Sequence, residues 1–149
     1  MEGSVMDKTR HLGVYGLIIE DNKVLLVKKS RGAYTGKLDL PGGSIEHGEK
    51  PEETLKRELL EETNCNIKEY KLLDANSVVV EWMHHKKIES MHHIGIIYDV
   101  KIENHNIKKD ADGQDSLGAN WYNIEDLSCD MISPLTILAL KKKNIQINN

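Results

Sequence analysis

Three glutamates, Glu58, Glu61 and Glu62, have the side-chain type and the spacing to bind a metal ion. In a helix, residues three and four positions apart project from the same face, so these carboxylates would lie together. Carboxylates held this close repel one another, and a cation such as Mg²⁺ relieves the repulsion because it prefers oxygen ligands. Arg57 lies one turn before Glu61, and we expect it to hold that carboxylate by a charge-assisted hydrogen bond. The pattern predicts a magnesium site, with manganese as an alternative.

A helix from about Pro51 to Thr63 must position these side chains. Pro51 suits the first position of a helix, because its missing N–H would have no partner there. Asn64 suits the left-handed residue that ends a helix. Before the helix, Gly42 and Gly43 follow a short apolar run, and they predict a loop whose backbone can approach a cation and phosphates closely. The segment therefore reads as a strand, a glycine loop and a helix.

The stretch from Gly43 to Cys65 resembles the signature of the Nudix hydrolases, enzymes that cleave a diphosphate joining a nucleoside to another group. The matching positions are Gly43, Glu49, Arg57, Glu58, Leu59, Glu61 and Glu62. One departure is Asn64, where the family usually has glycine; asparagine tolerates the same backbone conformation, so the helix end should be kept. The resemblance implies an α/β fold, an α/β/α sandwich around a mixed β-sheet, with residues 1–149 as a single domain.

The resemblance also implies hydrolysis that depends on Mg²⁺ or Mn²⁺ and releases a nucleoside monophosphate. Glu58, Glu61 and Glu62 would ligate the cation, and Arg57 would hold the carboxylate geometry. The small chain resembles the members that cleave nucleoside triphosphates, which makes a nucleotide of this kind the expected substrate. Nucleotide sugars, ADP-ribose and dinucleoside polyphosphates are alternatives. A proline that often marks ADP-ribose hydrolases is absent from the region of residues 80–81.

Two other interpretations compete with this one. A glutamate-rich helix is by itself often only a solvated surface, but the glycine loop and the register of the signature argue against that reading. A domain of this family can also bind a nucleotide as a sensor without hydrolysing it. Such domains usually lose acidic positions of the signature, and every acid is present here.

Further candidates lie outside the helix. Gly42, Gly43, Arg31 and Trp121 are expected to contact substrate; Arg31 belongs to a basic group with Lys28, Lys29 and Lys37. Trp121 could instead be a packing residue, and Tyr15 and Tyr34 are weaker candidates for base stacking. Glu46, Asp112 and Asp115 are candidate additional acids, with turn formation as the alternative for the two aspartates. His84, His85, His92 and His93 flank an expected hairpin and could bind zinc or nickel, although adjacent strand residues point to opposite faces.

Composition narrows the function classes. The chain has 149 residues, with 39% hydrophobic and 30% charged residues and a net charge of −4. No apolar run is long enough to span a membrane, and no basic stripe suggests a nucleic-acid duplex as partner. Cys65 and Cys129 are too few for a disulfide framework, which favours the cytoplasm and two buried thiols. A homodimer is compatible with the family resemblance, and the sequence does not decide it.

The remaining elements follow from apolar runs and turn residues. We expect a hairpin of strands at residues 14–19 and 24–27, and further strands at 37–40, 70–82 and 94–102. A short capped turn should occupy residues 123–127. Ser133 and Pro134 should open a final helix that carries Leu135, Leu138 and Leu140. This order of strands and helices fits the sandwich that the resemblance implies.

Overall fold

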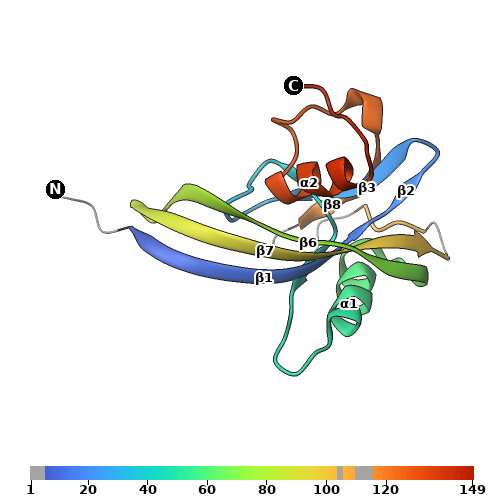
Figure 1. The fold of residues 1–149 in the computed structure, drawn as a ribbon, viewed down its shortest axis with the longest axis horizontal. Coiled ribbons are helices and arrows are strands. Elements are labelled where there is room, and N and C mark those ends of the chain that lie inside the picture. Colours follow the sequence, from blue (N-terminus) through green and yellow to red (C-terminus); the bar gives the residue numbers. More distant parts are fainter. Residues whose placement is uncertain (1–5, 104–105, 110–115) are drawn as a thin grey trace.

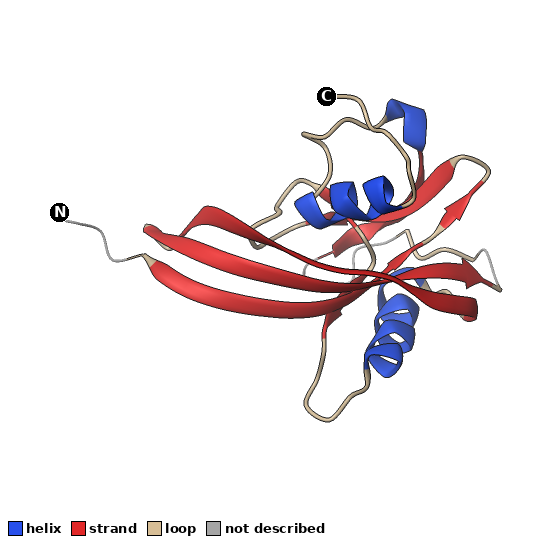
Figure 2. Cartoon of the chain, in the orientation of Figure 1, coloured by secondary structure: helices blue, strands red, loops and turns tan. Residues whose placement is uncertain are grey.

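The computed structural model describes residues 6–103, 106–109 and 116–149. Figures 1 and 2 show the chain as strands with two α-helices and one short 3₁₀ helix. In chain order the elements are β1 (Asp7–Leu17), β2 (Ile19–Glu20), β3 (Lys23–Lys29), β4 (Leu38–Asp39), β5 (Gly42–Ser44), α1 (Pro51–Thr63), β6 (Ile67–His84), β7 (Lys87–Ile102), β8 (Ser116–Asn123), η1 (Ile124–Asp126) and α2 (Pro134–Lys142).

The strands form two sheets. The first has the order β5-β1-β7-β6, with β1 parallel to β7 and both other pairs antiparallel. The second joins β2, β3 and β4 in antiparallel order, and β8 pairs with β3. Helices α1 and α2 lie on opposite faces of the first sheet (Figure 1). The expected α/β/α sandwich around a mixed sheet is therefore confirmed.

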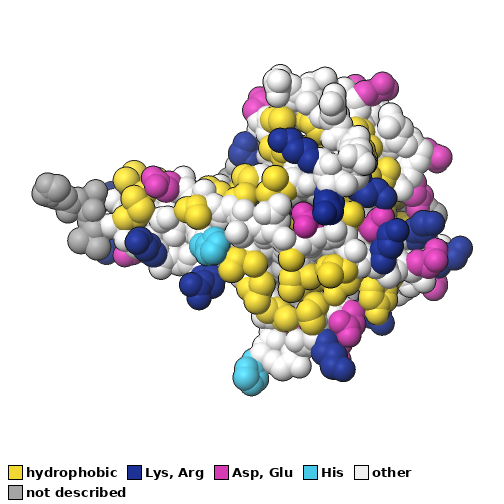
Figure 3. Space-filling model, viewed as in Figure 1, with side chains coloured by type: hydrophobic (Ala, Val, Ile, Leu, Met, Phe, Trp, Pro, Cys, Tyr) yellow, Lys and Arg dark blue, Asp and Glu magenta, His cyan; other side chains and the backbone are white. Residues whose placement is uncertain are grey.

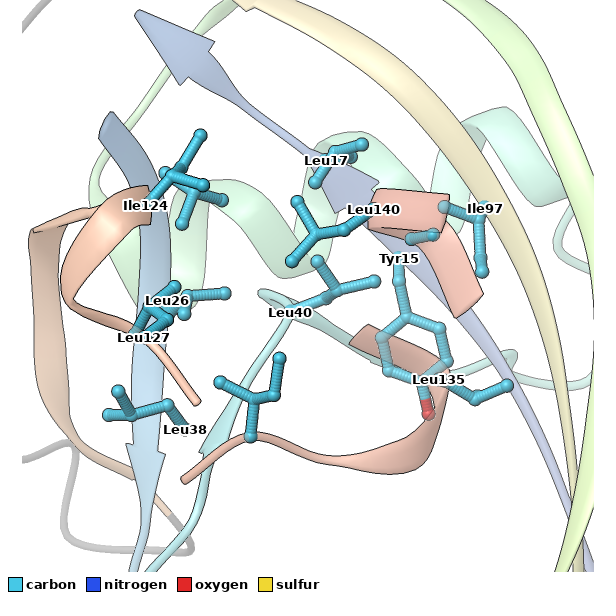
Figure 4. Close-up of a cluster of buried hydrophobic side chains, with 13 residues drawn as sticks. Tyr15, Leu17, Leu26, Leu38, Leu40, Ile97, Ile124, Leu127, Leu135 and Leu140 are labelled. Carbon is cyan, nitrogen blue, oxygen red and sulfur yellow. The ribbon is translucent and has the colours of Figure 1, made fainter. Parts of the chain in front are cut away.

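Alternation along β1 builds a separate core on each face of the first sheet, because successive strand residues point to opposite sides. Leu17 packs with Leu140 of α2, in the cluster that Figure 4 shows. Val14 packs instead with Leu55 and Leu59 of α1. All five side chains are fully or almost fully buried. Burial of Leu55 and Leu59 fixes the rotation of α1, and with it the direction of the glutamates on the same helix.

Both ends of α1 are formed as the sequence predicts. Pro51 is the first helical residue, and the N–H of Lys50 donates a 2.7 Å hydrogen bond to the Glu53 carboxylate. Asn64 has φ 62° and ψ 25°, the left-handed conformation in which a glycine was expected from the family. The Asn64 N–H donates to the Leu60 carbonyl at 3.0 Å. Asparagine thus ends the helix without loss of the capping hydrogen bond.

Three strands are longer than expected. The first begins at Asp7 rather than at residue 14. Strand β6 extends as far as His84, and β7 already begins at Lys87. The extra length forms an arm in which residues 7–12 of β1 lie beside β7, and β7 pairs with β6 (Figure 1). Residues 7–10 are all exposed, so they lack the alternation of apolar side chains that identifies a strand in a sequence. Backbone pairing with β7 makes them a strand.

The final helix and the cysteines agree with expectation in part. The Ser133 hydroxyl accepts a hydrogen bond from the Thr136 N–H, which caps α2, and Leu135 and Leu140 are buried. Leu138 is only partly buried. Cys65 is buried, whereas Cys129 is half-buried, so the expectation of two buried thiols holds for Cys65 alone.

Hydrophobic side chains also occur at the surface. In Figure 3 they gather on the face viewed, where Figure 1 has β6 and α1. Among the exposed large side chains are Leu60 on α1 and Tyr70 and Leu72 on β6. Within the described residues, the helices are too short or too polar to cross a membrane.

Candidate active site

A cleft of about 1050 Å³ collects the predicted site residues. Its walls include all three glutamates of α1, Glu58, Glu61 and Glu62, together with Gly42 and Gly43 of β5. Strands β1 and β7 also contribute to its lining. The structure thus brings together, in one cleft, the carboxylates and the two glycines that the sequence predicted, although these glycines belong to strand β5 rather than to a loop.

The two glycines allow the backbone of β5 to touch the helix carboxylates. The Gly42 N–H donates a 2.7 Å hydrogen bond to Glu62 Oε1. Gly42 has φ 145°, and a Cβ there would lie 2.1 Å from the Val14 carbonyl oxygen. A Cβ on Gly43 would lie 2.5 Å from Glu58 Oε2. Any side chain at these positions would therefore displace either the strand or a carboxylate.

Arg57 holds the carboxylates in place, but its main partner differs from the expected one. Its Nε and Nη2 donate to the two oxygens of Glu49 at 2.8 and 2.9 Å, and its Nη1 donates to Glu58 at 2.8 Å. The expected contact with Glu61 is longer, at 3.4 Å. The hydrogen bonds from Arg57 lower the pKa of Glu49 to about 2, and those to Glu49 raise the pKa of Arg57. Glu49 is thus a structural partner whose role the sequence did not reveal.

The donor set suits a hard divalent cation, although it is not preassembled. Within the described residues, no three acidic, histidine or cysteine side chains converge to form a metal site. One reason is that Arg57 pairs with Glu58, while the side chain of Glu61 remains 57% exposed. Carboxylate oxygens on one wall of a cleft are nevertheless the ligands that Mg²⁺ and Mn²⁺ prefer. Glu58, Glu61 and Glu62 are the residues that would hold the cation.

Of the other expected residues, Arg31 and Glu46 line the cleft. Glu46 lies close to the positioning arginine, with its carboxylate 3.8 Å from Arg57 Nε. Lys29 of the basic group also lines the cleft. Lys37 does not contribute, because its ammonium group donates to the Asp130 carbonyl at 2.8 Å.

Trp121 is placed elsewhere. It lies on β8 and packs against the core cluster on the α1 side, and the described residues that line the cleft do not include it. This position favours the packing role over contact with substrate. The candidate acids Asp112 and Asp115 lie outside the described residues.

The four histidines do not gather into a metal site within the described part of the chain. The rings of His84 and His85 lie 4.2 Å apart at the hairpin end of the arm. His93 is 1% exposed and lines the cleft, whereas its neighbour His92 points to the other face of β7. The alternation expected for adjacent strand residues explains this separation.

His93 instead takes part in a contact that the sequence did not predict. Its Nε2 lies 2.6 Å from Tyr15 Oη, and its Nδ1 lies 2.7 Å from Tyr34 Oη. The ring of His11 stacks on it, with centroids 4.7 Å apart and planes 4° from parallel. Burial, together with the nearby charges of His11 and Lys29, lowers the pKa of His93 to about 3. The imidazole is therefore neutral at physiological pH.

Comparison with known proteins identifies the family. The NUDIX domain matches residues 9–143. An ADP-ribose pyrophosphatase of Methanocaldococcus jannaschii is 42% identical over 66 residues, 44% of this chain and 39% of that protein. An 8-oxo-dGTP diphosphatase of Escherichia coli is 36% identical over 56 residues, 37% of this chain and 43% of that protein. The chain spans less than half the length of either relative.

Solved structures share the fold. A Nudix hydrolase from Nitrosomonas europaea superposes with a TM-score of 0.59 and 24% identity, over 91% of this chain and 88% of that one. The Nudix domain of Shewanella oneidensis NrtR, solved with ADP-ribose, gives a TM-score of 0.55 and 19% identity, over 91% and 86% of the two chains. With the domain match extending over most of the sequence, these findings show that the chain belongs to the Nudix hydrolase family.

Proposed function

We propose that this protein hydrolyses a diphosphate bond in a nucleoside diphosphate derivative, with Mg²⁺ or Mn²⁺ as cofactor, and releases a nucleoside monophosphate. The observation that carries the proposal is the shared cleft. Glu58, Glu61 and Glu62 line it together with Gly42 and Gly43, which bring backbone against two of these carboxylates. Family membership supports the reaction class.

Each residue has a distinct part in the proposed reaction. A bound cation would neutralise the diphosphate and activate a water molecule for attack on phosphorus. Glu58, Glu61 and Glu62 would hold it, and Arg57 positions Glu58 through their 2.8 Å hydrogen bond. Glu46 lines the same cleft and is a candidate to accept the proton of the attacking water. Arg31 and Lys29 supply positive charge for the phosphates.

The substrate is proposed only as a class. A nucleoside triphosphate or a related nucleotide is the first candidate, and the E. coli relative is named for such a substrate. ADP-ribose is the second, because one relative is named for it and one solved domain was determined with it. Nucleotide sugars and dinucleoside polyphosphates complete the set.

We also propose that residues 1–149 form one domain, that it works in the cytoplasm as a monomer or homodimer, and that it needs no nucleic-acid duplex or membrane.

The test is a product screen over nucleoside triphosphates, 8-oxo-dGTP, ADP-ribose, a nucleotide sugar and a dinucleoside polyphosphate, with Mg²⁺, with Mn²⁺ and with EDTA. Turnover should require the cation, and ¹⁸O-labelled water should identify the phosphorus attacked. Glu58→Gln and Glu61→Gln should each lower turnover by at least about a hundredfold, since a catalytic cation contributes several kcal/mol. Glu69→Gln is the matched control, because Glu69 is an exposed residue of β6 whose partner is Lys101 of β7, and it lies outside the described wall of the cleft.

Two results would contradict the proposal. Wild-type turnover in both glutamine variants would show that these carboxylates do not hold a catalytic cation. Tight nucleotide binding without product over hours would instead support the sensor function that the family also allows.

A further inference from the structure

Tyr15, His93 and Tyr34 form a chain of side-chain contacts, which we call the relay. Both nitrogens of the His93 ring contact a tyrosine hydroxyl, at 2.6 Å from Tyr15 and 2.7 Å from Tyr34. The three residues are at most 6% exposed, yet all three line the cleft that holds the glutamates. No role in the hydrolysis proposed above uses them.

Two glycines make room for the relay. Gly13 of β1 and Gly95 of β7 are paired across the first sheet. A Cβ on Gly13 would lie 2.2 Å from Tyr15 Oη, and a Cβ on Gly95 would lie 3.5 Å from the Tyr15 ring. The ring therefore lies over both glycines, and Figure 4 shows it at the edge of the core cluster, near Leu135. Its hydroxyl reaches His93 because neither strand position carries a side chain.

The hydrogen bonds of the relay leave one hydrogen without an acceptor. A neutral imidazole has one N–H and one bare nitrogen, so one tyrosine donates to His93 and the other accepts from it. The accepting tyrosine keeps its own hydroxyl hydrogen. Within the described residues, neither the Tyr15 hydroxyl nor the Tyr34 hydroxyl has a hydrogen-bond partner other than His93. A buried donor without an acceptor is costly, so water in the cleft or a bound molecule that replaces it should supply one.

Packing decides which tyrosine carries the free hydrogen. The Tyr15 hydroxyl is pressed against Gly13, which leaves no space for a ligand beside it. Tyr34 lies between β3 and β4, next to Ala33 and near Arg31, which also line the cleft. The Tyr15 hydroxyl therefore donates to His93 Nε2, and the N–H at His93 Nδ1 donates to the Tyr34 hydroxyl. Tyr34 in turn directs its own hydrogen into the cleft.

The relay is uncharged. His93 is neutral because of its burial, and a second proton on its ring would make both tyrosines acceptors. Burial and the nearby carboxylate of Asp39 raise the pKa of both tyrosines, so they stay protonated. The relay thus offers one neutral donor, whereas the positive charge that suits phosphates comes from Arg31 and Lys29.

We propose that the relay selects the group beyond the diphosphate, by donating one hydrogen bond from Tyr34 to an uncharged oxygen of that group. This inference rests on the proposed function, because it takes the diphosphate to lie at the glutamates. A sugar hydroxyl or a nucleobase carbonyl would supply such an oxygen. Tyr15 and His93 are positioning residues in this arrangement, since they set the direction of the Tyr34 hydrogen without touching the ligand.

The experiment measures binding, so it does not depend on turnover. Calorimetry with Mg²⁺ gives Kd for AMP, GMP and pyrophosphate with wild type, Tyr34→Phe and Tyr70→Phe. Tyr34→Phe should weaken a monophosphate about 3- to 10-fold, the range of one neutral hydrogen bond, and leave pyrophosphate unchanged. Tyr70→Phe is the matched control, because Tyr70 is a 41% exposed tyrosine of β6 that lies outside the described wall of the cleft.

The ligand pair separates the two sources of the oxygen. An equal loss for AMP and GMP would identify a sugar hydroxyl, because the adenine base has no carbonyl. A loss for GMP alone would identify the base carbonyl. Unchanged Kd values for both monophosphates, or an equal loss for pyrophosphate, would overturn the proposal, as would wild-type protein that binds neither monophosphate. Failure of the proposed function would appear separately, as absence of product in the nucleotide screen.

Tyr15→Phe gives a second test that a packing role would not satisfy. Without the Tyr15 hydroxyl, Tyr34 becomes the only relay donor to His93, and its hydrogen is drawn away from the cleft. We therefore expect Tyr15→Phe to weaken the same monophosphate as Tyr34→Phe, although it touches no ligand. The ¹⁵N signals of His93 should show the hydrogen on Nδ1 in the wild-type complex and shift toward Nε2 in the Tyr15 variant. Signals that are the same in both proteins would contradict the relay.

Discussion

Arg57 binds Glu49 through both carboxylate oxygens, at 2.8 and 2.9 Å, while a third nitrogen atom donates to Glu58 at 2.8 Å. Glu49 lies in the loop before α1, so the guanidinium ties this loop to the helix that carries the metal-binding carboxylates. The planar fork of arginine matches this geometry, and a lysine ammonium cannot reproduce it. The contact therefore links loop order to the position of Glu58.

Arg57→Lys should lower turnover about 10- to 100-fold, the usual effect of removing a group that orients a metal ligand. Because lysine keeps the positive charge, a loss of turnover would be caused by the missing hydrogen-bond geometry of the guanidinium group. Lys56→Arg is the control, because the Lys56 ammonium group lies 5.4 Å from the centre of the Tyr70 ring, whereas Glu58 and Glu61 pair with Arg57. Steady-state kinetics across Mg²⁺ concentrations provide the measurement. Equal activity of both variants would contradict the positioning role.

The adjacent glycines of β5 should respond differently to alanine. In Gly43→Ala the new Cβ meets the end of the Glu58 side chain, which can move, so the protein should fold and lose activity. In Gly42→Ala the Cβ meets the Val14 carbonyl oxygen of the backbone, at a φ of 145°, so the protein should lose stability. Thermal unfolding and turnover of both variants separate the outcomes. A Gly43→Ala protein with wild-type turnover would show that the Glu58 position is not critical.

The pairing of Glu49 predicts a pH dependence of stability. Its pKa is about 2 when folded and 4.5 in the absence of partners, so the unfolded chain binds the proton more readily between these values. The stability from this pair should be complete above pH 4.5 and decline as pH falls toward 2. The difference in free energy of unfolding between wild type and Glu49→Gln should shrink over the same interval. A difference that is independent of pH would show that charge on Glu49 does not contribute.

The burial of His93 predicts a second pH dependence of stability, at higher pH than that of Glu49. Its pKa is about 3 when folded and 6.5 without the protein environment, so unfolding takes up a proton between these values. Stability should be complete above pH 6.5 and fall toward pH 3, by at most about 1.4 kcal/mol per pH unit for one proton. Urea unfolding of wild type and His93→Gln measures the difference. The ring signal of His93 in NMR checks the point directly in wild type, and protonation near pH 6.5 would contradict it.

Local sequence predicted the glutamate wall well because its parts are close in the chain. Pro51, Asn64 and the leucines of α1 specify the helix and its rotation, and this places the glutamates. The preference of Arg57 for Glu49 could not be read from helical spacing, because Glu49 lies before the helix.

The arm and the relay depend on contacts that spacing does not encode. Residues 7–11 are polar and become a strand through pairing with β7. The residues of the relay are ordinary core types, and only the register of β1 with β7 brings Tyr15 to His93. Two histidines side by side in the sequence suggested a metal, whereas the fold buries one of them between tyrosines.

The two groups of residues that line the cleft therefore differ in how the chain builds them. Gly42 and Glu62, whose hydrogen bond joins β5 to the glutamates of α1, are 20 positions apart. The other two glutamates lie between them in the sequence. The contacts of His93 join it to residues 78 and 59 positions away. The reactive wall can thus be inherited as one short continuous segment. The selective wall is shared among three distant segments, so its preference can drift by single substitutions in any of them while the segment that performs the reaction stays the same.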